Sequence, residues 1–121
     1  MTLARVAFLG LLMTNPALAI EGSYAVTGAG VNGAGAYRGV AEIKKTGATY
    51  SLVWQVGPLR HRGTGILTED VLSVVFFGSG PSQAPGLATY RVVNGRVAEG
   101  TWTVLGGQEV ATERMEPSDR I

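Results

Sequence analysis

The sequence lacks cysteine entirely and contains a single histidine, His61, among its 121 residues. Without cysteine the chain can form no disulfide, thiol nucleophile or thiolate metal ligand, so its stability must come from a packed core and backbone hydrogen bonds. One histidine cannot build a histidine-rich zinc or copper site within one chain. We therefore expect no cofactor and no metal centre, and a hard-cation site made of carboxylates is the arrangement that these counts leave open.

Hydrophobic runs long enough to cross a membrane are also lacking. The apolar run Val6–Met13 near the N-terminus is well short of the roughly 20 residues that a helical span needs. Arg5 precedes this run, and Pro16 and the small-x-small ending Ala17-Leu18-Ala19 follow it, which is the order of regions in a secretory signal peptide. We predict that residues 1–19 are a cleaved signal peptide rather than a membrane anchor, and that the protein is exported to the periplasm or outside the cell.

An excess of charge of either sign is absent from the predicted mature chain. Arg5 is the one basic residue in the leader, so nine of the ten basic residues remain and face nine acidic ones. A partner such as nucleic acid or an anionic membrane would be expected to select a basic patch, so we expect neither. Residues 20–121 are enough for one domain and too few for two, and we predict a single domain there with no integral membrane span.

The composition and periodicity of residues 20–121 favour strands. The chain has 18 glycines and no sustained helical periodicity, whereas apolar and polar residues alternate in stretches such as Tyr50–Gln55 and Ala98–Val104. We expect eight strands, at residues 22–28, 36–45, 48–56, 60–68, 71–78, 87–94, 96–105 and 108–115. The predicted fold class is therefore all-β.

Short turns separate these strands. Asn94-Gly95 is a strong hairpin signal because both positions of a type I′ turn need a positive φ, and Lys45-Thr46-Gly47, Glu69-Asp70 and Gly106-Gly107 are further turn sequences. Such links imply an antiparallel up-and-down meander, and an even number of strands allows the first to pair with the last. We predict a closed eight-stranded barrel, with a two-layer β-sandwich as the alternative.

One side of each predicted strand carries most of the large apolar and aromatic side chains. Eight strands leave an interior just wide enough for side chains to fill, so we favour a filled interior over a ligand cup lined by Tyr50, Trp54, Tyr90 and Trp102. Val71, Val75 and Phe77 fall on the outer side, where they could touch a partner or a loop. The predicted interior set is Tyr24, Val26, Tyr37, Gly39, Ala41, Ile43, Tyr50, Leu52, Trp54, Gly63, Gly65, Leu67, Leu72, Val74, Phe76, Tyr90, Val92, Ala98, Gly100, Trp102 and Val104.

Three segments could carry chemistry or recognition. Residues 28–33 match the glycine spacing of a dinucleotide-binding loop, but a strand follows them instead of the helix that receives a pyrophosphate, so we interpret them as a hairpin loop. Arg60-His61-Arg62 is the densest basic spot; we interpret it as a solvated strand start paired with Glu69 or Asp70, in preference to an anion clamp. Residues 78–86 form the longest irregular segment and are the best loop candidate for a binding edge.

Several strand signatures resemble those of avidin-like and lipocalin-like small barrels. They are Tyr37-x-Gly39, Gly47-x-x-Tyr50-x-Leu52-x-Trp54 and Gly100-Thr101-Trp102. The resemblance implies an eight-stranded meander that binds a small hydrophobic or cyclic ligand in its mouth. In avidins the Gly-Thr-Trp stands in the first strand and here it stands in the seventh, so the identity of a ligand is not carried over. The chain also resembles short exported bacterial proteins of unknown role.

From these observations we expect an exported, non-enzymatic binding or interaction module for a small ligand or a protein partner. The expected ligand-binding residues are Tyr50, Trp54, Tyr90, Trp102, His61 and Arg62, and we expect no catalytic residue. The alternative is a small exported hydrolase or isomerase that uses His61 or Glu113 as its base. Glu113-Arg114 near the end of the chain could close the barrel by pairing with the first strand or form a buried ion pair, and the letters do not decide between these arrangements.

Overall fold

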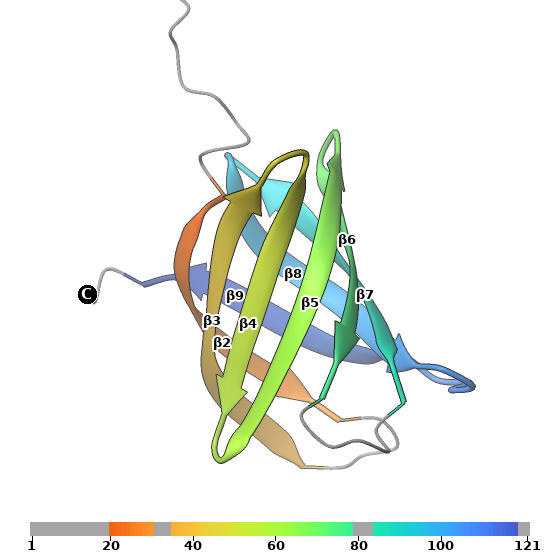
Figure 1. The fold of residues 1–121 in the computed structure, drawn as a ribbon. Helices are drawn as coiled ribbons and strands as arrows, with labels where there is room; N and C mark the ends of the chain where they lie inside the picture. The colour runs from red at the N-terminus through yellow and green to blue at the C-terminus, as the bar shows by residue number, and fades with distance from the viewer. Residues whose placement is uncertain (1–19, 31–34, 79–83, 119–121) are drawn as a thin grey trace, which may run out of the picture.

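Eight antiparallel strands form a closed barrel in a computed structural model that describes residues 20–30, 35–78 and 84–118 (Figure 1). Each strand pairs with the next along the chain, and the first pairs with the last. The meander barrel predicted from the sequence is confirmed, and the sandwich alternative is wrong. The strands are β2 (Gly22–Ala29), β3 (Ala36–Thr46), β4 (Thr49–Val56), β5 (Leu59–Thr68), β6 (Val71–Phe77), β7 (Gly86–Val93), β8 (Arg96–Val104) and β9 (Ala111–Pro117).

The strand boundaries follow from alternation and turn chemistry. All strands but β9 begin and end within one residue of their predicted limits. Asn94 and Gly95 have φ values of 52° and 78°, as the predicted type I′ turn requires. Within the described ranges there is no helix, and hence none that is long and apolar enough to cross a membrane.

One end of the barrel, here called the sealed end, is filled by side chains. It is the end at which β3 turns into β4, β5 into β6 and β7 into β8, at the top of Figure 1 for the first two. The Tyr24 hydroxyl donates to the Ile20 carbonyl oxygen over 2.8 Å and accepts from the Val97 backbone N–H over 3.2 Å. The buried apolar side chains that fill this end include Ile20, Tyr24, Ile43, Tyr50, Leu72 and Val97.

A β-bulge in β8 changes which residue faces inward. Tyr90 pairs with Gly100 but Val92 pairs with Val97, so the two residues Ala98 and Glu99 lie opposite Arg91 alone. The extra residue reverses the alternation, and Val97 is buried while Ala98 is only partly so. The prediction that Ala98 faces inward is therefore wrong, because strict alternation cannot represent a bulge.

The outer wall of β6 is apolar as well as its inner wall. Val71, Val75 and Phe77 are exposed, as predicted, and Val75 lies beside exposed Leu87 of β7. On the inner side, Leu72 and Val74 are fully buried. The strand therefore presents apolar side chains in both directions.

Candidate functional site

The opposite end of the barrel, here called the open end, holds a cavity of about 350 Å³. The open end is the one at which β2 leads to β3, β4 to β5, β6 to β7 and β8 to β9, at the bottom and right of Figure 1. The interior expected to be filled throughout is thus filled at the sealed end only. The aromatic side chains that line the cavity come from different strands and are Tyr37, Trp54, His61, Phe76, Tyr90 and Trp102.

Glycines on neighbouring strands explain why these rings leave the centre free. Tyr37 is paired across the sheet with Gly28, and Phe76 with Gly86. A Cβ atom at either glycine would overlap the ring of its partner, so each ring packs directly on bare backbone. Large side chains that lie against the wall in this way occupy the space next to a glycine rather than the axis of the barrel.

The rings form a connected aromatic wall. Trp54 and Phe76 have ring centroids 5.8 Å apart, and Phe76 and Trp102 have centroids 6.2 Å apart in an edge-to-face arrangement. Tyr37 continues the chain of contacts to Trp102 at 6.5 Å. These separations are those of favourable aromatic pairs, so the wall is held by its own contacts.

A carboxylate lies within this wall. Glu113 of β9 is only 7% exposed and accepts three hydrogen bonds, from the Tyr37 hydroxyl at 2.5 Å, the Tyr90 hydroxyl at 2.7 Å and the Trp54 indole N–H at 3.2 Å. The Trp102 indole N–H donates in turn to the Tyr37 hydroxyl over 3.0 Å. Each of the three partners of Glu113 is a neutral donor, and the side chain acts as an acceptor only, which is the hydrogen-bonding pattern of an ionised carboxylate.

The register of the sheet places the carboxylate between its tyrosines. Glu113 is paired with Gly28 of β2 on one side and with Gly100 of β8 on the other. Tyr37 packs over Gly28 from the strand beyond, and Tyr90 packs over Gly100 in the same way, where a Cβ would lie 2.6 Å from the Tyr90 ring. Both hydroxyls therefore reach across a glycine to the same carboxylate.

Burial and the carboxylate together keep both tyrosines protonated. Burial raises the pKa of Tyr37 above that of an ordinary tyrosine, and the hydrogen bond to Glu113 raises it further. The pKa of Tyr90 is also raised well above its usual value, first by burial and then by the negative charge of Glu113. Both hydroxyls consequently remain hydrogen-bond donors to the carboxylate over the physiological pH range.

The structure brings four of the six predicted site residues together. Trp54, His61, Tyr90 and Trp102 line the cavity. Tyr50 does not, because it is buried at the sealed end beside Lys45 and Gly65. Arg62 does not either, because alternation along β5 turns it to the exposed outer face.

The predicted pairing of the basic spot with Glu69 or Asp70 is wrong. Arg60 and Arg62 are at the open-end start of β5, whereas Glu69 and Asp70 form the turn after its other end. Over the described ranges the ion pair present is Arg91 with Glu99, at 3.4 Å on the outer face. The strand length therefore separates the charges that the sequence interpretation paired.

Sequence reasoning did not include Tyr37, Phe76 or Glu113 among the binding residues. Tyr37 and Phe76 were correctly assigned to the interior. For Glu113 two alternatives were open, namely pairing of its strand with the first strand to close the barrel, or a buried ion pair with Arg114. The structure places Glu113 at the β2–β9 seam and buries it, but Arg114 points outward and is exposed. The available signal was the alternation of Ala111, Glu113 and Met115 in β9, all of which are buried.

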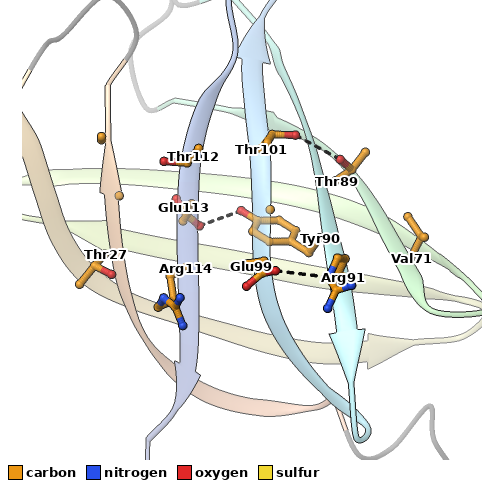
Figure 2. Close-up of a pocket in the computed structure, with 13 residues that line it drawn as sticks. Thr27, Val71, Thr89, Tyr90, Arg91, Glu99, Thr101, Thr112, Glu113 and Arg114 are labelled. Carbon is orange, nitrogen blue, oxygen red and sulfur yellow. Dashed lines mark hydrogen bonds and ion pairs between the residues drawn. The ribbon is translucent and has the colours of Figure 1, made fainter.

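A second hollow, of about 720 Å³, lies on the outer face of the same wall (Figure 2). Figure 2 shows Tyr90 bonded to Glu113 within the wall, and Arg91 paired with Glu99 beside the hollow. The outer side chains of this surface are exposed. The inner cavity is the smaller of the two, yet it is the better candidate site, because it combines shielding by aromatic rings with a buried charge.

The described lining of the cavity includes both bases of the enzyme alternative, His61 and Glu113, and the hydroxyls of Tyr37 and Tyr90, but no serine, threonine or lysine. His61 Nδ1 is buried and has no hydrogen-bond partner in the described part of the chain, so no acidic residue orients the ring there. Among residues 20–30, 35–78 and 84–118, no three potential ligands cluster to hold a metal ion.

Known proteins provide no further guide. No family model, curated protein or solved structure matches the chain. Two predicted loops also lie partly outside the described ranges, namely residues 31–33 of the glycine-rich loop at 28–33 and residues 79–83 of the loop at 78–86 that was expected to form a binding edge. Function must therefore be argued from the chemistry of the cavity itself.

Proposed function

We propose that this protein is a non-enzymatic module that binds a small ligand in the open-end cavity. The observation that carries the proposal is the buried Glu113 carboxylate within a wall of aromatic rings. Ligand sites are typically concave and mostly apolar, with a few placed polar groups that orient the ligand. The open-end cavity has this composition, and its volume of about 350 Å³ suits a small organic molecule.

The contrast with the sealed end supports a role in binding. Both ends are built from the same strands, and the sealed end is packed with fully buried side chains. At the open end, the glycines at positions 28 and 86 let the Tyr37 and Phe76 rings lie against the wall, and a cavity remains beside these rings. An arrangement that forgoes packing in this way is expected where a site is needed, because stability and function compete for the same residues.

The proposed setting is the periplasm or the outside of the cell. It rests on the signal-peptide pattern of residues 1–19, which lie outside the described ranges. Intact-mass measurement of exported protein should give a chain that begins at Ile20. Recovery of exported material that retains residues 1–19 would contradict this setting.

Binding can be tested with the two tryptophans as reporters, since both line the cavity. Three probes that share a phenyl ring, 2-phenylethylammonium, 2-phenylethanol and 3-phenylpropanoate, would be titrated to millimolar concentration while the indole N–H resonances are followed by NMR. At least one probe should shift both resonances in a saturable manner. If no probe does so, the cavity is not a ligand site and the proposed function is wrong.

A matched pair of rim variants locates the binding. Val104 lines the cavity and Val93 lies at the other end of the barrel, and both are 40% exposed. Val104→Phe should narrow the cavity and weaken the bound probe about tenfold, which corresponds to about 1.4 kcal/mol. Val93→Phe should leave binding unchanged, and an equal loss in both variants would show that the probe binds elsewhere.

A further inference from the structure

The Glu113 carboxylate has no cationic partner in the described part of the chain. Its hydrogen-bond partners there are two tyrosines and a tryptophan, and the one ion pair lies outside the barrel between Arg91 and Glu99. Arg114, the adjacent residue, points to the outer face. A buried carboxylate is costly to desolvate unless a positive charge compensates it, and none of these side chains supplies one.

The carboxylate also retains capacity for another donor. An ionised carboxylate offers about four acceptor positions. Three are occupied, by Tyr37 on one oxygen and by Tyr90 and Trp54 on the other. Because Glu113 lines the cavity, a ligand held there can reach the remaining position.

The aromatic wall favours the same sign of charge. The faces of tryptophan, tyrosine and phenylalanine rings carry partial negative charge and attract cations that have lost their water. Trp54, Phe76 and Trp102 form consecutive ring contacts around the cavity, and Tyr37 extends them. A cation in this space would therefore gain from the rings as well as from the carboxylate.

We infer that the open-end cavity selects an organic cation, namely a protonated amine attached to a small apolar body. The ammonium group pairs with Glu113 and the apolar part lies against the rings of Trp54, Phe76 and Trp102. This inference rests on the proposed binding function and specifies the class of its ligand. An anion would be repelled by Glu113, and a neutral ligand of the same shape would leave the carboxylate uncompensated.

The three phenyl probes separate these cases, because they share a ring and a short chain and differ in the charge of the head group. The wild-type protein should bind 2-phenylethylammonium about tenfold more tightly than 2-phenylethanol, and 3-phenylpropanoate more weakly than either. If the alcohol or the carboxylate binds as tightly as the amine, the cavity is a ligand site but not a cation site. If none of the three binds, the proposed function itself fails.

Charge-removing variants assign the preference to Glu113. Glu113→Gln retains the size of the side chain, and it should abolish the preference for the amine while binding of 2-phenylethanol persists. Glu116→Gln is the matched control, because Glu116 lies on the same strand, is exposed, and its replacement removes the same charge. An amine preference that survives in Glu113→Gln, or is lost equally in Glu116→Gln, would overturn the inference. If Glu113→Gln does not fold, the probe series on the wild-type protein still decides the question.

Discussion

The two ends of the barrel each contain inward-facing tyrosines, but the tyrosine hydroxyls have different partners. At the sealed end the Tyr24 hydroxyl bonds to the backbone of Ile20 and Val97. At the open end the hydroxyls of Tyr37 and Tyr90 bond to the carboxylate of Glu113. A tyrosine that bonds to backbone groups completes a packed core. Tyrosines that surround a carboxylate instead fix its position, where a ligand can interact with it.

The packing around these hydroxyls differs in the same sense. Ile20, Tyr24 and Leu72 at the sealed end are completely buried, whereas Tyr37 and Trp102 at the open end are only half-buried. One continuous sheet can thus be a packed core at one end and a binding site at the other. The residues that decide between these outcomes are the inward-facing ones, since the backbone is shared.

The largest effect on this contrast is expected from truncation at the sealed end. Leu72→Ala should lower the free energy of unfolding by about 2–5 kcal/mol, because it leaves a cavity in a packed region. Leu59→Ala at the open end, where the side chain is 50% exposed, should cost much less. Denaturant unfolding measures both, and equal losses would mean that the two ends are packed alike.

The packing of aromatic rings on bare glycine backbone can be tested by adding a single methyl group. Gly86→Ala places a Cβ where the Phe76 ring now lies, so the ring must move toward the cavity, at a cost of about 1–3 kcal/mol. Gly35→Ala is the control, because no atom of the described residues lies within 4 Å of the position that its new methyl group would take. Thermal unfolding should distinguish the two variants, and a Gly86→Ala protein as stable as Gly35→Ala would show that the ring does not depend on the glycine.

Removal of the sealed-end hydroxyl should have a smaller effect. Tyr24→Phe retains the ring but leaves the buried Val97 N–H without its partner, which should cost about 1–2 kcal/mol. Probe binding at the open end should be unaffected. A variant that folds with full stability but loses binding would contradict the separation of the two ends.

The last effect concerns alkaline pH and develops gradually, because it appears only above about pH 10. Tyr37 and Tyr90 have pKa values raised above that of an unfolded tyrosine, which is about 10. The folded state therefore holds these protons after the unfolded state has lost them, so the stability they contribute is full below about pH 10 and falls as the pH rises further. The melting temperature should therefore fall as the pH is raised above about 10. It should fall less steeply in the double variant Tyr37→Phe/Tyr90→Phe. Equal slopes would show that other groups cause the decline.

The fold was accessible from the sequence because its rules are local. Alternation located the strands, and Asn94-Gly95 located a turn through its required φ values. The bulge at Ala98-Glu99 was missed, since it depends on pairing with β7 rather than on any local pattern. The local sequence pattern thus predicted the strands, whereas the bulge depends on the pairing between β7 and β8.

The site was accessible only in part. Trp54 and Trp102 could be assigned to the interior by parity, but the same residues suit a filled core or a cavity. The outcome depends on which residue stands beside each ring, as Gly28 stands beside Tyr37, and this requires the register of the sheet. Glu113 was harder still, because patterning rules place charges outside and functional sites are where those rules fail.

Both ends of the described chain lie at the sealed end of the barrel. Ile20 is buried there, and the Ser118 backbone N–H donates to the Ser23 carbonyl oxygen over 2.9 Å at the start of β2. A tether, a fused domain or a second barrel that continued directly from Ile20 or Ser118 would therefore begin on the side away from the cavity. A barrel joined in this way could be anchored, displayed on a surface or repeated in tandem while its open end still faces the solution.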